Sequence, residues 1–134
     1  MTTMYVDFHL SSNEHNFDFS DIILFGKIKK NNIGDMDKKR NRVITSCNWS
    51  CYTEEKNFIF TNDALNEFYE NIKVNFNEIK KRIIELNLEV DIYVVINTTD
   101  EDDTFGVTFN KEILKICTEL NADLSVDTIF PKEF

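Results

Sequence analysis

The spacing of apolar residues between positions 61 and 87 constrains the fold of this chain more than any other feature. They recur every three or four positions, which is the period of an α-helix, and therefore line one stripe of it. The stripe consists of Leu65, Phe68, Tyr69, Ile72, Phe76, Ile79, Ile83 and Leu86. Thr61, Asn62 and Asp63 offer side-chain oxygens to the free amides of the first turn. At ~1.5 Å per residue the helix is roughly 35–40 Å long, enough to cross a small sheet.

Four other segments alternate apolar and polar residues, which is the pattern of half-buried strands. They are residues 4–10, 42–52, 89–98 and 123–130. In the last of these, Leu124, Val126 and Phe130 are expected to face inward, and Pro131 is expected to end the strand. Residues 58–60 are expected to form a short apolar lead into the long helix.

Two shorter helices are predicted. Residues 20–25 are expected to form one, capped by Asp18 or Ser20 and closed by Gly26. Residues 111–120 are expected to form the other, capped by Asn110. Its buried stripe would contain Ile113, Leu114, Cys117 and Leu120. Residues 27–41 are predicted to be a basic loop with a turn at residues 33–35.

Together these elements predict an α+β fold in a single domain over residues 1–134. One mixed or antiparallel sheet of four to five strands would carry the long and the shorter helix on one face. The strand order stays open, but the uncovered face collects the same residues in any order. They are Tyr5, Asp7, His9, Ser46, Asn48, Asp91, Tyr93, Asn97, Ser125 and Asp127.

The formal net charge of -9 is unevenly spread along the chain. Residues 27–42 hold seven Lys or Arg against two Asp, so the rest of the chain is strongly acidic. An acidic body argues against nucleic-acid binding, which needs a positive field over the phosphates. It suits a protein that is steered towards a basic partner.

Targeting signals and metal sites are not evident in the sequence. No apolar run approaches the ~18–20 residues of a membrane span, and the first residues lack the features of a signal peptide. We therefore expect a cytoplasmic protein that does not engage membranes. Cys47, Cys51 and Cys117 are expected to be reduced and buried. Cys47 and Cys51 would lie about 13 Å apart along one strand, which disfavours a zinc site.

Two groups of residues invite a chemical interpretation. The acidic run at residues 100–103 lacks the Gly and the distal Glu of a calcium loop, so we expect a solvated loop or a partner contact. His9 beside Asp7 or Asp91 would resemble an oriented general base, but no nucleophile or glycine-rich phosphate loop accompanies it. We therefore predict no enzyme, no metal and no cofactor. An enzyme using these three residues, and a ligand-binding or sensor module, remain the alternatives.

Three segments together resemble a bacterial family, domain-of-unknown-function family 4279. They are residues 24–28 with the Gly34–Asp35 turn, the segment around Trp49, and the terminal strand at residues 120–130. The order of elements is similar to that of the family over nearly the whole chain. The family has no established catalytic residues, so the resemblance implies a fold rather than an activity. In size and acidity the chain also resembles immunity proteins encoded beside bacterial polymorphic and contact-dependent toxins.

These observations lead to one functional hypothesis: a non-catalytic, immunity-type protein, monomeric when free, that occludes the active site of a basic cognate toxin. Tyr5, Tyr52 and Tyr93 would act as aromatic anchors. The predicted partner-binding residues are Tyr5, Asp7, His9, Asp91, Tyr93, Asp100, Glu101, Asp102, Asp103 and Asp127.

Overall fold

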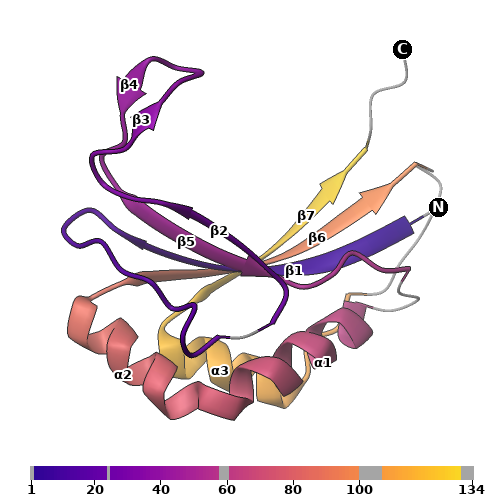
Figure 1. Ribbon diagram of the computed structural model, residues 1–134. Helices are drawn as coiled ribbons and strands as arrows, with labels where there is room; N and C mark the ends of the chain where they lie inside the picture. Colours follow the sequence, from indigo (N-terminus) through magenta and orange to yellow (C-terminus); the bar gives the residue numbers. More distant parts are fainter. Residues whose placement is uncertain (1, 24, 58–60, 100–106, 131–134) are drawn as a thin grey trace.

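A five-stranded sheet with all helices on one face forms the frame of the protein (Figure 1). The computed structural model describes residues 2–23, 25–57, 61–99 and 107–130. The sheet has the order β2-β5-β1-β6-β7, in which only the β6–β7 pair is parallel. Its strands are β1 (Thr2–Ser12), β2 (Lys27–Asn31), β5 (Cys47–Tyr52), β6 (Glu89–Thr98) and β7 (Asp123–Ile129). The predicted α+β fold with one mixed sheet is confirmed.

The two faces of the central strand β1 differ in burial. Met4, Val6, Phe8 and Leu10 are each at most 1% exposed, and the residues between them are only partly buried. Because side chains alternate along a strand, the even positions face the helices and the odd positions face away. The same division continues into β5, where Cys47, Trp49 and Cys51 are fully buried, and into β6.

The long helix predicted for residues 61–87 is present but interrupted. It consists of α1 (Thr61–Ile72), a 3₁₀ turn η1 (Lys73–Asn75) and α2 (Phe76–Leu86). The interruption leaves Ile72 and Phe76 four positions apart, so the apolar spacing does not reveal it. Asn75 leaves helical geometry, and its side-chain amide donates to the carbonyl of Ile22 at 2.8 Å. The predicted stripe faces the core, with Leu65, Phe68, Ile72, Ile79 and Ile83 buried and the other three partly buried.

Asparagine ends both major helices in the left-handed conformation. Asn87 and Asn121 have φ values of 51° and 52°, and the amides of Leu88 and Ala122 bond back to carbonyls of the last turn. Asparagine tolerates this geometry better than other residues with a side chain. Helix α3 (Lys111–Leu120) begins as predicted, because Asn110 Oδ1 accepts the amide of Ile113 at 2.9 Å.

The helix predicted for residues 20–25 is wrong. The chain makes a single turn there, in which the amides of Ile22 and Ile23 both donate to the carbonyl of Phe19. Phe19 and Ile23 are buried, so core packing fixes this segment without a regular helix. Gly26 follows with φ +69°, and a Cβ there would lie 2.1 Å from the carbonyl oxygen of Tyr52.

The basic loop predicted for residues 27–41 is also wrong in part. Residues 27–31 form β2, and β3 (Met36–Asp37) pairs with β4 (Arg42–Val43) in a small hairpin. The strand predicted for residues 42–52 is therefore split into β4 and β5. The alternation of apolar and polar residues does not predict β2, because this strand is exposed along its whole length and has lysines on both faces.

In β7 and in α3, some residues predicted to face the core are exposed in the structure. Val126 and Phe130 are 36% and 48% exposed, because β7 is an edge strand of the sheet. On α3, Leu114 is 48% exposed and Ile116 is buried instead. The predicted lead at residues 58–60, Pro131, and the capping side chains of Thr61 and Asn62 lie outside the described residues.

Within the described part of the chain, no helix has the length and apolar character needed to cross a membrane.

Two isoleucines on α2 test the packing of the long helix. We expect Ile79→Asp to unfold the protein, because a buried unpaired charge costs several kcal/mol. Ile79 is 1% exposed, whereas Ile84 on the same helix is 66% exposed. The matched Ile84→Asp variant should therefore melt close to the parent in thermal denaturation followed by circular dichroism. Equal melting temperatures for both variants would show that the stripe is not the core contact.

Candidate functional site

The sheet face that points away from the helices in Figure 1 is here called the open face. The strand register places polar and aromatic residues of all five strands on it. Its residues are Tyr5, Asp7 and His9 from β1, Lys27, Lys29 and Asn31 from β2, Asn48, Ser50 and Tyr52 from β5, Asp91, Tyr93 and Asn97 from β6, and Asp123, Ser125 and Asp127 from β7. The structure thus brings together six predicted partner-binding residues, which are Tyr5, Asp7, His9, Asp91, Tyr93 and Asp127. The other four, at positions 100–103, lie outside the described residues.

A row of three residues crosses the middle of the open face. Asp7 on β1 pairs with Tyr52 on β5 and with Tyr93 on β6, so a carboxylate stands between two tyrosines on neighbouring strands. We call Tyr52, Asp7 and Tyr93 the central row. Directly opposed residues in a sheet lie about 5 Å apart, close enough for these side chains to act together.

Asp7 is the residue of this row whose side chain has a buried oxygen, Oδ1, without a hydrogen-bond partner among the described residues. Burial raises the pKa of the Asp7 carboxyl, and nearby His9 and Lys29 only partly oppose that rise. A buried carboxylate oxygen without a partner costs free energy, so the chain keeps Asp7 at the expense of stability.

Two of the tyrosines around Asp7, Tyr5 and Tyr93, have raised pKa values. The rings of Tyr5 and Tyr52 are tilted by 52° with centroids 6.0 Å apart. Burial, reinforced by Asp7 and other carboxylates, raises the pKa of Tyr5, and burial with Asp91 and Asp7 does the same for Tyr93. The hydroxyl groups of Tyr5 and Tyr93 therefore remain neutral donors and acceptors beside a carboxylate.

A groove of about 590 Å³ runs along the β1–β5–β2 side of this face. It is lined by Tyr5, Asp7, His9, Lys27, Lys29, Asn31, Asn48, Ser50, Tyr52, Thr53, Glu54 and Glu55. Glu55 is held in place by hydrogen bonds from Thr3 and, at 2.8 Å, from Asn97. These bonds lower the pKa of Glu55, so its negative charge at the groove is maintained.

His9 is fully hydrogen-bonded by neutral groups. Its Nδ1 lies 2.7 Å from Ser50 Oγ and its Nε2 lies 3.1 Å from Asn48 Oδ1. The amide nitrogen of Asn48 donates to Ser46, which turns the Asn48 oxygen towards His9. The network therefore assigns the proton to Nε2, with Ser50 donating to Nδ1. Because both ring nitrogens are engaged, neither Asp7 nor Asp91 orients the imidazole.

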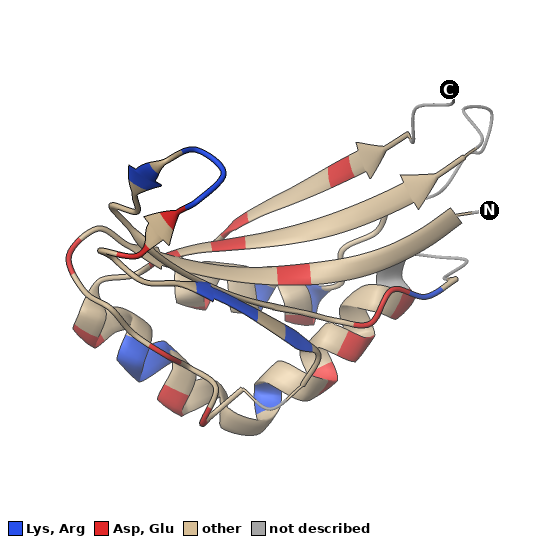
Figure 2. Ribbon diagram, turned by 45° about the horizontal axis from the view of Figure 1, so that its top comes forward, with Lys and Arg blue, Asp and Glu red and all other residues tan. Residues whose placement is uncertain are grey.

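Charge is divided across the sheet (Figure 2). Carboxylates lie on β1, β6 and β7, whereas lysines and arginines gather on β2 and around the β3–β4 hairpin. The open face is thus acidic over its middle and far edge, with a basic border at β2. Cations of a partner would be attracted to the acidic part.

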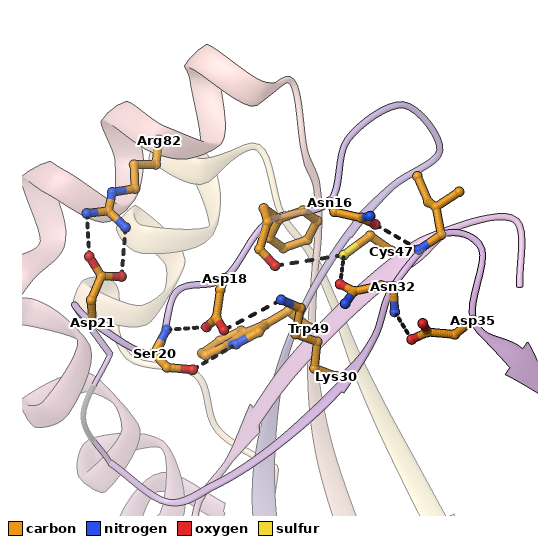
Figure 3. A network of polar contacts seen from close by, with 12 residues as sticks. Asn16, Asp18, Ser20, Asp21, Lys30, Asn32, Asp35, Cys47, Trp49 and Arg82 are labelled. Carbon is orange, nitrogen blue, oxygen red and sulfur yellow. Dashed lines mark hydrogen bonds and ion pairs between the residues drawn. The ribbon is translucent and has the colours of Figure 1, made fainter.

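The segment between β1 and β2 holds the β2–β5 side of the sheet in place (Figure 3). Trp49 Nε1 donates to Ser20 Oγ at 3.4 Å, and Asp18 accepts the Ser20 amide and pairs with Lys30. Arg82 of α2 clamps Asp21 through two hydrogen bonds of 2.7 and 2.8 Å. These contacts lie on the helix side of the sheet, so they support the open face from behind.

The cysteines do not belong to this site. All three are free and buried, as predicted for Cys47, Cys51 and Cys117. The Cys51 thiol donates to the carbonyl of Phe25, and burial raises its pKa to about 12, so it is inert. Within the described ranges, no cluster of three His, Cys, Asp or Glu is placed to hold a metal ion.

Sequence reasoning missed part of the open face. The sequence predicts a loop at Lys27 and Lys29, and it does not indicate the hydrogen bond between Ser50 and His9. Asp123 joins the face because it pairs with Asp91 across β6 and β7. Residues 48, 50 and 52 alternate with residues that are buried, and this alternation could have placed Ser50 on the open face. Strand β2 has no such alternation, because all of its residues are exposed.

The fold and the open face define an α+β domain with one helix-covered and one uncovered sheet face. The chain belongs to the family described as Domain of unknown function (DUF4279), which matches residues 3–131. No curated protein and no solved structure matches the chain.

The unpartnered carboxylate predicts a pH-dependent stability. Because the folded pKa of Asp7 is raised, the folded state binds the proton more tightly than the unfolded chain does. Stability is therefore lost as pH rises from the unfolded pKa through the folded pKa. We expect Asp7→Asn to stabilise the protein at pH 7, by on the order of 1 kcal/mol, and to have little effect near pH 3.

The matched control is Asp18→Asn. Hydrogen bonds from Ser20, helped by Lys30, lower the pKa of Asp18, so its ionised form stabilises the fold above the unfolded pKa. That variant should be destabilised at pH 7. Urea titrations of both variants at the two pH values measure this difference. A loss of stability in Asp7→Asn at pH 7 would contradict the assignment of Asp7 as an uncompensated group.

Proposed function

We propose that this protein is a non-catalytic, immunity-type binding protein that neutralises a cognate bacterial toxin by covering its active site with the open face. One observation carries the proposal. Three tyrosines stand among carboxylates on a sheet face that no helix of the described chain covers. Aromatic side chains presented on such a face are typical anchors of protein interfaces.

The size of the open face fits such an interface. Five strands about 4.8 Å apart give a width of ~20 Å, and the length of β1 at ~3.3 Å per residue is roughly 35 Å. Because the other strands are shorter than β1, the face covers roughly 600 Å², which is near the lower end of the range around ~800 Å² that each partner buries in a standard complex.

The charge of the face selects the kind of partner. Asp7, Asp91, Asp123 and Asp127 would stand where a basic toxin, such as a nuclease-like domain, otherwise holds phosphates. Complementary charge speeds association and discourages wrong partners. The acidic residues at positions 100–103, which follow β6 in the sequence, are included in the proposed partner-binding set.

Co-expression with the C-terminal domain of the protein encoded immediately upstream tests this function. We expect the parent protein to restore growth, and the triple variant Asp91→Asn, Asp123→Asn, Asp127→Asn to protect less well. Its association rate at low salt should fall about tenfold or more, since steering depends on these charges. Growth assays and stopped-flow binding measure the two effects.

The control removes the same charge from the helix side, through Glu85→Gln, Glu112→Gln and Glu119→Gln. That variant should protect as the parent does. Failure of the parent to protect, or equal protection by both triple variants, would refute the proposed use of the open face.

A hydrolase is the second candidate, favoured by the hydrogen bond between Ser50 Oγ and His9 Nδ1. A serine bonded to an imidazole that a third group orients is the arrangement of an activated nucleophile. Here the third group is the neutral amide of Asn48, which stabilises an imidazolium less than a carboxylate does. Ser50 is also only 9% exposed. The non-catalytic function is therefore preferred.

Serine-directed labelling separates the two candidates. We expect a fluorophosphonate probe not to label the parent protein, because Ser50 is poorly accessible and weakly activated. Labelling, or ester turnover, that disappears in both Ser50→Ala and His9→Ala would instead establish the hydrolase. Mass spectrometry of the intact protein gives the readout.

A further inference from the structure

We infer that the central row is a receptor for a guanidinium group, supplied by an arginine side chain of the partner. The assignment of the arginine to a protein partner rests on the proposed function. The chemistry of the receptor rests on the geometry of Tyr52, Asp7 and Tyr93 alone.

The first step concerns the carboxylate. Asp7 lies on the central strand with a tyrosine beside it on each neighbouring strand, and no described residue donates a hydrogen bond to its buried Oδ1 atom. A carboxylate has room for several donors, and leaving it short of them is costly. A ligand that brings N–H donors to this position would relieve that cost.

The second step concerns the cations of the chain itself. Lys29 lies near enough to oppose the rise of the Asp7 pKa, yet no ion pair within 4.0 Å joins Asp7 to any described residue. Lysines elsewhere on the chain do pair closely, for example Lys56 with Glu67 at 3.0 Å. Among the described residues, the Asp7 carboxylate therefore has no direct cationic partner.

The third step selects the cation. A guanidinium is planar, donates two parallel hydrogen bonds to a carboxylate and stacks on aromatic rings, whereas an ammonium is compact and strongly hydrated. The central row offers one carboxylate between two tyrosine rings, which matches the planar group. A divalent metal is disfavoured, because the described residues bring no cluster of three ligating side chains together.

A blocked arginine, N-acetyl-arginine amide, is the probe, and the corresponding citrulline compound is its neutral match. Titrations followed by the NMR signals of labelled tyrosine rings report binding at the row. We expect saturable shifts with the arginine compound. Binding of the citrulline compound should be about tenfold weaker or more, the size expected when a charge-assisted hydrogen bond is lost.

Two variants localise the site. Asp7→Asn should weaken binding of the arginine compound about tenfold or more, and Glu112→Gln, which removes a carboxylate from the helix side of the protein, should change it about twofold or less. The first variant is expected to be at least as stable as the parent at pH 7, so lost binding would not reflect unfolding. Equal binding of arginine and citrulline, or equal losses in the two variants, would overturn the receptor.

The outcomes separate this inference from the proposed function. Binding of the arginine compound that depends on Asp7, with no growth protection by the parent, would refute the toxin-neutralising function and support the receptor. Protection by the parent without any binding of the arginine compound would refute the receptor and support the function. Binding of a blocked lysine compound as tight as that of the arginine compound would overturn the choice of guanidinium.

Discussion

The structure depends on the one-sided burial of β1. This strand is hydrogen-bonded on both edges, by β5 and β6, so its backbone is satisfied and only its two faces remain to be used. The side chains at even positions, such as Phe8, are buried on the side of the helices, while those at odd positions lie on the open face. A shift of one residue in register would exchange the two sets, so the same apolar alternation that builds the core also fixes which side chains form the candidate site.

The edges of the sheet are supported in different ways. On the β2–β5 side, the segment between β1 and β2 inserts Phe17, Phe19 and Ile23 into the core and is tied to Trp49 and Arg82. A helix would place Phe17 on the side opposite Phe19 and Ile23, so an irregular path is needed to bring all three side chains to the core. On the other side β7 is covered less, which leaves its apolar residues partly exposed. The groove consequently lies on the better supported half of the sheet.

Periodicity predicted the elements whose two faces differ in polarity. β1, β6 and the stripe centred on Phe68 and Ile79 were readable because burial alternates there. β2 was not, since Lys27 and its neighbours are exposed on both faces, and η1 was not, since it preserves the apolar spacing. Strand order is set by long-range pairing, which leaves no local signal. The composition of the open face could therefore be predicted in large part, but the opposition of Asp7 to two tyrosines could not.

The open face contains two polar groups that sequence reasoning treated alike, and the structure separates them. His9 has a hydrogen-bond partner within the sheet at each ring nitrogen. A ligand would have to displace one of these partners to bond to the imidazole. Asp7 lines the groove, and its buried oxygen has no donor among the described residues, so a ligand in the groove that donates to this carboxylate would break no hydrogen bond there. Natural proteins sit only slightly above their stability threshold, and an uncompensated carboxylate lowers that margin. A group that costs stability in the free protein is a candidate for a binding residue, so we expect a ligand of the open face to bind at Asp7 rather than at His9.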